Sequence, residues 1–237
     1  MAHEAQREFI QACIGRFSPA VNDSSSILEV GSQNINGSIR DYFPDASSRT
    51  WLGLDVGNGK GVDFVIPGEL IQLPDGWADI SFSTECFEHA KNWKQIFLNM
   101  IRCTRPNGLI VLTIAGLGRS AHGTVDTESE LSPYTTDYYK NLGSQDILLG
   151  IDVNKYFLRY AIEVNSIDCD TYFWGIRSPL LDGTEVLTTE ESLSRARGQL
   201  GLIMIANREL KRQLFVAKSP SVAVYKALLK LWRIFIR

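Results

Sequence analysis

The stretch that decides the fold is Ile27-Leu28-Glu29-Val30-Gly31-Ser32-Gln33-Asn34-Ile35-Asn36-Gly37-Ser38. An apolar run ends in an acidic residue and a glycine, and a polar turn leads to a second glycine before a short predicted helix over 38–43. The next apolar run, 50–54, is followed by Asp55, 24 positions beyond Gly31. This order is that of a βαβ nucleotide half-site: a strand, a close-approach turn and a carboxylate for ribose hydroxyls. The stretch therefore predicts a nucleotide-type cofactor site.

Strand-like and helix-like segments continue to alternate after this unit. The predicted strands are 26–30, 50–54, 62–65, 78–83, 109–115, 157–164 and 171–177, and the predicted helices are 4–17, 38–43, 92–104, one or two short ones within 136–149, and 187–215. The polar segment 116–133 is too long for an ordinary connection, so we expect a substrate loop there. The pattern predicts an α/β fold: a Rossmann-like, doubly wound, mostly parallel seven-stranded sheet with one antiparallel strand, flanked by helices.

Charge is unevenly distributed along the 237 residues. The formal net charge is −3, but the segment from Asn207 onward carries eight basic residues and one acid, which leaves −10 for the rest of the chain. An acidic body argues against nucleic-acid binding by the main domain. We divide the chain into a main domain, 1–216, with a cofactor half over about 25–115 and an acceptor-side half over about 116–180, and a basic C-terminal helix, 217–237.

The C-terminal segment has the pattern of a cationic amphipathic helix. Its polar stripe consists of Lys226, Lys230, Arg233 and Arg237, opposite a face that contains Trp232. This pattern over 219–237 is typical of contact with an anionic membrane surface or a partner's groove, and equally of packing on the chain's own domain or a dimer mate.

Metal and export signals are weak in the sequence. Four cysteines are scattered without CxxC spacing and there are three histidines, so we expect no metal site. No apolar leader segment and no apolar run of about 20 residues occurs. We therefore expect a cytoplasmic protein, with peripheral membrane contact through 219–237 as one interpretation.

A βαβ half-site of this kind could serve a dinucleotide or S-adenosylmethionine. Glu29, two positions before Gly31, could reach a cationic amino-acid group, and the two closing strands would place an antiparallel strand that dinucleotide folds generally lack.

The chain also resembles class I S-adenosylmethionine-dependent methyltransferases, in particular the type 11 methyltransferase domain. The resemblance covers about 25–115 and rests on Leu28-Glu29-Val30-Gly31, Gly53-Leu54-Asp55, Leu73-Pro74-Asp75, the run from Ala78 to His89, and Thr104-Arg105-Pro106-Asn107-Gly108-Leu109.

The resemblance implies a role for eight residues in binding S-adenosylmethionine: Glu29 and Gly31 at the methionine end, Asp55 at both ribose hydroxyls, Val56 near the adenine, Glu69 and Leu70 at the adenine amino edge, and Thr84 and Glu85 at the methionine moiety and sulfonium. The chain departs from the family in its turn. Gln33 and Ile35 stand where further glycines are usual, and Gly37 comes late, which predicts a longer turn.

Catalytic residues are harder to predict, because methyl transfer mainly needs an aligned acceptor lone pair. His122, in the predicted substrate loop, is the candidate general base for an acceptor hydroxyl. Tyr134, Tyr138 and Tyr139 could line an acceptor pocket, or simply pack. For Glu88 and His89 we expect a structural role before a helix.

The sequence thus predicts an S-adenosylmethionine-dependent methyltransferase acting on a small-molecule or glycan-type acceptor, at a hydroxyl. Two alternatives stay open at this point: a non-catalytic protein that binds through the same fold, and a nicotinamide-dependent dehydrogenase.

Overall fold

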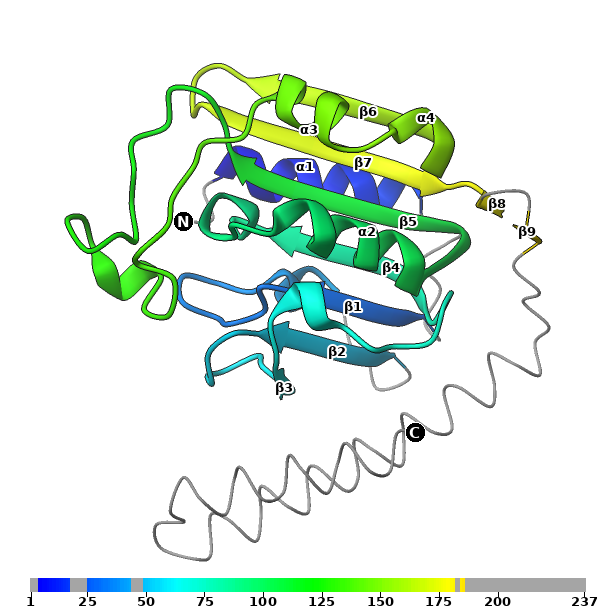
Figure 1. The fold of residues 1–237 in the computed structure, drawn as a ribbon, viewed down its shortest axis with the longest axis horizontal. Coiled ribbons are helices and arrows are strands. Elements are labelled where there is room, and N and C mark those ends of the chain that lie inside the picture. The colour runs from blue at the N-terminus through cyan, green and yellow to red at the C-terminus, as the bar shows by residue number, and fades with distance from the viewer. Residues whose placement is uncertain (1–3, 18–24, 44–48, 182–183, 186–237) are drawn as a thin grey trace, which may run out of the picture. The chain divides into compact units, whose positions relative to one another are not determined.

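The chain forms a seven-stranded mixed sheet in the order β3-β2-β1-β4-β5-β7-β6, shown in Figure 1. The computed structural model describes residues 4–17, 25–43, 49–181 and 184–185. The strands are β1 Ser26–Val30, β2 Thr50–Asp55, β3 Phe64–Val65, β4 Ala78–Thr84, β5 Thr104–Ala115, β6 Phe157–Asn165 and β7 Asp170–Arg177, with a separate hairpin of β8 Leu180–Leu181 and β9 Thr184–Glu185. β1 to β5 pair in parallel, and β7 is antiparallel to both of its neighbours. The predicted sheet with one antiparallel strand is confirmed.

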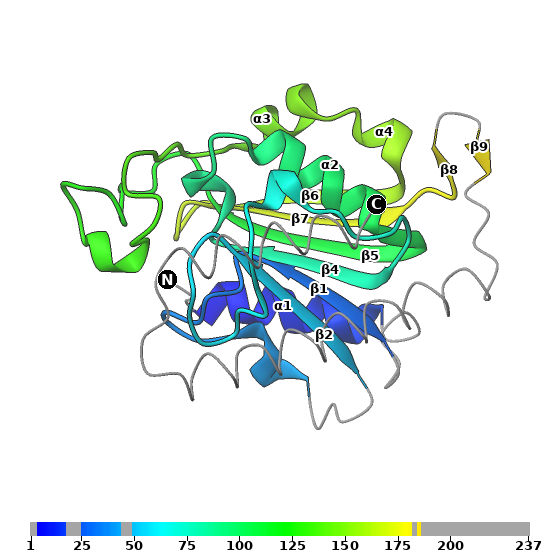
Figure 2. The same cartoon turned by 60° about the horizontal axis from the view of Figure 1, so that its bottom comes forward.

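Helices cover both faces of this sheet (Figures 1 and 2). The α-helices are α1 Glu4–Arg16, α2 Trp93–Cys103, α3 Ser144–Gly150 and α4 Val153–Tyr156, and the short 3-10 helices are η2 Ile39–Tyr42, η3 Gly68–Leu70, η4 Phe87–His89 and η5 Ser129–Leu131. α1 lies on one face, and α2, α3 and α4 lie on the other. The sheet is therefore buried on both sides, and the central strands β1 and β4 are buried along almost their whole length, polar residues such as Ser81 and Ser83 included.

Each face of the sheet has its own apolar core. On the α1 side, Ile10 and Cys13 of the helix join a buried cluster with Ile27, Ile80 and Phe82. On the α2 side, aromatic rings from three elements meet. The ring of Phe97 lies 5.3 Å from that of Phe173 and 5.9 Å from that of Phe157, centroid to centroid. Burial of rings of this size is a main apolar contribution to stability.

The largest differences from the predicted boundaries are at the start of β5 and in the connection that follows it. β5 begins at Thr104, five residues before the predicted 109, because Thr104 pairs with Ala78 of β4 ahead of a register shift. Asn107 takes up that irregularity with φ +61°. The connection after β5 also has no α-helix before Ser144, so the loop continues past 133 to 143. A sequence pattern does not reveal a bulge, because the bulge depends on the neighbouring strand.

All described residues belong to one compact unit within Met1–Leu193. The predicted helices 187–215 and 219–237, and the predicted boundary at 216, lie outside the described residues and stay predictions. Among the described residues, no helix combines the length and the apolar character that crossing a membrane requires.

A buried carboxylate, Asp79 of β4, joins two neighbouring elements at the end of the sheet opposite the strands' carboxyl termini. It accepts a hydrogen bond from the backbone N–H of Ser26 (2.6 Å) and pairs with the Arg105 guanidinium (2.5 Å). Its relative exposure is 8 %. Removing this carboxylate leaves a buried N–H donor without an acceptor.

We expect Asp79→Ala to lower the free energy of unfolding by about 2–3 kcal/mol, because buried charge-assisted bonds of this kind are costly to break. Urea denaturation followed by circular dichroism measures this. The matched control is Asp75→Ala, which breaks an ion pair to Arg102 whose aspartate side chain is 60 % exposed, and should cost at most about 1 kcal/mol. Equal losses in the two variants would contradict the assignment.

Candidate functional site

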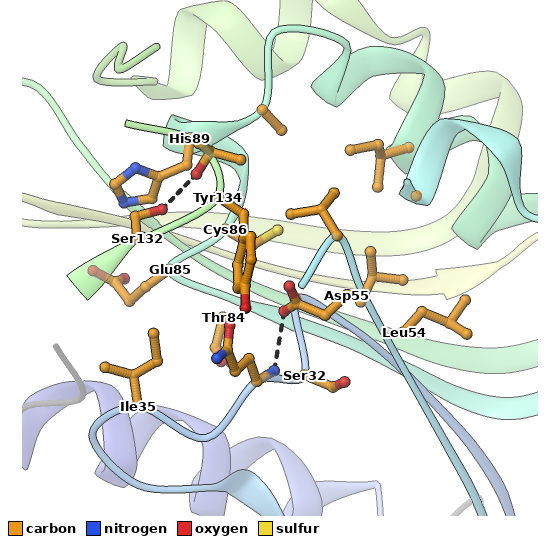
Figure 3. A pocket seen from close by; sticks show the side chains of 18 of the residues that line it. Ser32, Ile35, Leu54, Asp55, Thr84, Glu85, Cys86, His89, Ser132 and Tyr134 are labelled. Carbon is orange, nitrogen blue, oxygen red and sulfur yellow. Dashed lines mark hydrogen bonds between the residues drawn. The ribbon is translucent and has the colours of Figure 1, made fainter. Parts of the chain in front are cut away.

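A cavity of about 390 Å³ opens at the carboxyl edge of the parallel strands (Figure 3). Its wall includes the turn after β1, the end of β2, the end of β4, and the long loop between β5 and α3. Asp55 lines it on the β2 side and His122 on the loop side. Ligands of open α/β sheets bind at this edge, because successive loops diverge there and leave a crevice.

The turn after β1 begins at a glycine that no other residue could replace without strain. Gly31 has φ +78°, and a Cβ on it would lie 2.6 Å from the Cβ of Cys86. The N–H groups of Gly31 and Ser32 both donate to the carbonyl of Leu54, and that of Asn34 donates to Lys60. The chain itself therefore satisfies donors that a shorter glycine-rich turn would direct at a ligand.

Asp55 ends β2 with its carboxylate at the cavity. Oδ2 accepts a hydrogen bond from the Gln33 N–H and Oδ1 accepts one from the Gly57 N–H, both at 3.0 Å. Burial raises the pKa of the Asp55 carboxyl, and these backbone donors oppose the rise. Each carboxylate oxygen has a second lone pair, so the group can still accept hydroxyl donors from a ligand.

Tyr134, from the long loop, stands beside Asp55 (Figure 3). A Cβ on Gly57 would lie 1.9 Å from the Tyr134 ring, so the ring packs directly on the backbone there. Tyr134 has a relative exposure of 56 % and lines the cavity. A nucleoside held by Asp55 would contact this ring or displace it.

Glu29 lines the same cavity but is already bound within the chain. Its Oε2 accepts hydrogen bonds from Arg40 (3.2 Å) and from the indole N–H of Trp51 (2.9 Å), and the residue is 4 % exposed. Burial raises the pKa of the Glu29 carboxyl to about 7, opposed by Arg40 and Trp51. The carboxylate therefore holds β1, β2 and η2 together beneath the cavity.

Glu85 follows β4 in an uncommon backbone conformation, with φ +48°. For a residue with a side chain this costs of the order of 1–3 kcal/mol, and such strain gathers at functional sites. The carboxylate accepts a hydrogen bond from the buried Gln6 amide (3.1 Å) and lies 3.9 Å from the Arg119 guanidinium. Helix α1 thus reaches the cavity through Gln6, which also contacts Thr113.

Two histidines and a glutamate meet beside Glu85. His89 and His122 have ring centroids 5.2 Å apart, edge to face, and each ring also contacts that of Tyr139. Burial lowers the pKa of His89 to about 4, and the pKa of His122 is also lowered by burial. Burial raises the pKa of Glu88 well above its usual range, and the Glu85 charge raises it further.

Methyltransferases are among the known proteins similar to this chain. Residues 54–112 match the family model described as Methyltransferase domain. Among solved structures, the chain is similar to the CurJ carbon methyltransferase, with a TM-score of 0.53 and 15 % identity over 73 % of this chain and 54 % of that one. It is also similar to the Burkholderia thailandensis 1,6-didemethyltoxoflavin-N1-methyltransferase, solved with S-adenosylhomocysteine, with a TM-score of 0.50 and 9 % identity over 73 % and 78 %. A comparison with curated proteins finds no match.

Residues 54–112 therefore match a methyltransferase domain, and the fold is that of the class I methyltransferases. Domains of this class take the methyl group from S-adenosylmethionine. The chain spans about half the length of the CurJ protein. At identities this low the structural likeness shows the fold. The fold includes the antiparallel strand that the sequence predicted and that dinucleotide folds generally lack.

The residues of this methyltransferase domain fit the cofactor at its nucleoside end. Asp55 offers free lone pairs at the carboxyl edge, and the chain approaches closely at Gly31. Seven of the eight predicted cofactor residues line the cavity: Glu29, Gly31, Asp55, Val56, Glu69, Thr84 and Glu85. Leu70 is 58 % exposed and is not among the lining residues. The predicted general base, His122, lines the cavity as well.

Sequence analysis missed Gln6 and Arg119 and assigned a structural role to Glu88 and His89. Gln6 lies 79 positions before Glu85, and only the packing of α1 across the sheet joins them. Arg119 could have been suspected as a cation in the loop after β5. For Glu88 and His89 the available signal was an acidic residue next to a histidine directly after a buried strand.

We expect Asp55→Ala to weaken binding of S-adenosylhomocysteine by about 10- to 100-fold, since each hydrogen bond to a charged group contributes about 1.5–3 kcal/mol. Isothermal titration calorimetry measures this. Asp41→Asn, an exposed carboxylate on η2, is the control and should bind normally. An unchanged affinity in Asp55→Ala would remove Asp55 from the site.

Glu29 also makes stability depend on pH. Because its folded pKa of about 7 lies above the ordinary 4.5, the folded state holds the proton more tightly than the unfolded state. The free energy of unfolding of the native chain, relative to that of Glu29→Gln, should therefore fall as pH rises from 4.5 to 7 and level off above. Urea denaturation across this range tests it, with exposed Glu8→Gln as the surface control. A relative stability that rises with pH would mean that the Arg40 ion pair outweighs burial.

Proposed function

We propose that the protein is an S-adenosylmethionine-dependent methyltransferase that methylates a hydroxyl oxygen of a small-molecule or glycan-type acceptor. The observation that carries the proposal is a cavity lined both by Asp55 and by the imidazoles of His89 and His122. A donor bound at Asp55 and an acceptor beside the histidines would share this space. Bringing the two together in one orientation supplies much of the rate enhancement of methyl transfer.

An oxygen acceptor fits the polar groups at the loop side of the cavity. A hydroxyl is a poor nucleophile until it loses its proton, so it needs a proton acceptor beside it. A neutral amine or a carbanion already has a nucleophilic lone pair. His122 offers a proton acceptor: in the tautomer in which Nδ1 donates to the carbonyl of Ser120 (3.2 Å), Nε2 keeps its lone pair. The similar proteins named above methylate carbon and nitrogen, so the fold does not select the acceptor atom.

The cofactor roles follow the same arrangement. We assign Asp55 to the ribose hydroxyls, Val56 and Glu69 to the adenine side, and Thr84 and Glu85 to the methionine side. Glu69 accepts a hydrogen bond from Asn92 (2.9 Å), which holds its carboxylate at the cavity rim. Glu29 acts here through the turn that it anchors, because its carboxylate is bound to Arg40 and Trp51.

Radiolabelled methyl transfer from S-adenosylmethionine to a panel of matched alcohols and amines tests the proposal. Transfer to alcohols, with retained cofactor binding and at least a 100-fold loss of kcat in His122→Ala, is the expected result, because removal of a general base typically costs 10²–10⁴ in rate. Asp126→Asn, an exposed position of the same loop, is the control. Cofactor binding without transfer to any acceptor would favour a non-catalytic binding protein, and transfer to amines alone would overturn the hydroxyl assignment.

A further inference from the structure

The fold brings three potential metal ligands together outside the part of the cavity assigned to the nucleoside. Glu88 and His89 belong to η4, directly after β4, and His122 belongs to the loop after β5. One ligand atom from each lies within 4.8 Å of the other two. Parallel neighbours β4 and β5 end at the same edge of the sheet, which is why residues more than 30 positions apart meet here.

Glu88 is buried with no exposed surface, yet neither carboxylate oxygen has a hydrogen-bond partner among the described residues. The backbone N–H groups of Glu88 and Ala115 lie close enough to lower its pKa, but neither makes a well-formed hydrogen bond to the carboxyl oxygens. A buried polar group without a partner is costly, and native proteins retain few of them. Burial favours the neutral carboxyl, and a bound cation would instead hold it in the ionised form as a ligand.

Two cationic side chains of the loop after β5, Arg119 and Lys140, pair with other carboxylates. Arg119 pairs with Asp170 at 2.7 Å and approaches Glu85, and Lys140 pairs with Asp146 at 2.9 Å. Within the described part of the chain, no ion pair reaches Glu88. No cationic side chain in the described part of the chain therefore pairs with this carboxyl, and the Glu85 charge acts on it as a second acidic group.

Both imidazoles present a nitrogen that can bind a cation. In the tautomer in which His122 Nδ1 donates to the Ser120 carbonyl, Nε2 has a free lone pair, and such a second bond is how metal-binding histidines are held in orientation. The Nδ1 of His89 is buried and has no hydrogen-bond partner among the described residues. Two imidazoles and one carboxylate are a donor set that suits divalent transition metals better than Mg²⁺.

We propose that Glu88, His89 and His122 form a binding site for a divalent transition-metal cation. Metal–ligand bonds of about 2.0–2.2 Å place ligand atoms about 3–4 Å apart in one coordination sphere, so a small closure of the present arrangement completes the site. His89 and His122 line the cavity, so the open coordination positions face it. There a cation would take an oxygen ligand. That this oxygen belongs to the acceptor rests on the proposed function.

A bound cation would also change the role of His122. Its Nε2 lone pair would then be given to the metal, and the metal in place of the imidazole would favour the deprotonated hydroxyl. The sequence-based expectation of no metal site would then be revised for a physical reason: the three ligands come from two segments that only the sheet brings together.

Titration of the chelator-treated full chain with MnCl₂, followed by electron paramagnetic resonance of free Mn²⁺, tests the proposal without the cofactor. ZnCl₂ and MgCl₂ are added in parallel calorimetric titrations. We expect about one Mn²⁺ per chain and at least about 100-fold weaker binding in Glu88→Gln and in His122→Ala, since each removes a ligand. Glu130→Gln, an exposed carboxylate in the same loop, should bind as the native chain does.

Circular dichroism and the affinity for S-adenosylhomocysteine show whether each variant is folded. Glu88→Gln is isosteric and keeps a neutral, buried amide, so a purely structural carboxyl would leave Mn²⁺ binding unchanged. Unchanged binding in that variant, equal binding in all variants, or no binding to the native chain would each overturn the site. A protein that binds Mn²⁺ through Glu88 but transfers no methyl group would support the site and contradict only the proposed function.

Discussion

The hydrogen bond between the backbone N–H of Gln33 and the carboxylate of Asp55 joins the two parts of the cofactor side of the cavity. Gln33 belongs to the turn after β1, and Asp55 is the last residue of β2. A second bond from Gly57 holds the other oxygen of the carboxylate. Because the backbone fixes both oxygens, Asp55 faces the cavity before any ligand arrives, and little conformational entropy is lost on binding.

The turn itself shows how the chain manages without the usual glycines. Gly31 takes a left-handed backbone conformation at the start of the turn, and its lack of a Cβ allows the close contact with Cys86. The following N–H groups are bonded to Leu54 and Lys60 rather than left open for a ligand. A methyl donor bound here would therefore depend more on side chains at its amino-acid end than a donor bound to a glycine-rich turn does.

Acidic and imidazole groups gather on the other side of the same cavity, where burial is deep. Glu85 is held in a strained backbone conformation and tied to Gln6 of α1. Glu88 and the two histidines lie behind it, with pKa values that burial shifts toward their neutral forms. Burial of these ionisable groups costs folding free energy, because water would solvate them better. The packing of β4, β5 and their loops keeps them together despite this cost.

The sequence by itself determined the parallel sheet, the antiparallel strand after β5, the Gly31 turn and the position of Asp55, because these follow from local patterns of apolar runs, glycines and strand-terminal acids. Only the tertiary structure decided which side chains meet. It placed Gln6 against Glu85, Tyr134 over Gly57, and His122 beside His89. It also moved the start of β5 to Thr104 and bound the Glu29 carboxylate to Arg40 and Trp51. Contacts of this kind join residues far apart along the chain, and burial and charge balance at the meeting point decide them, neither of which a local pattern contains.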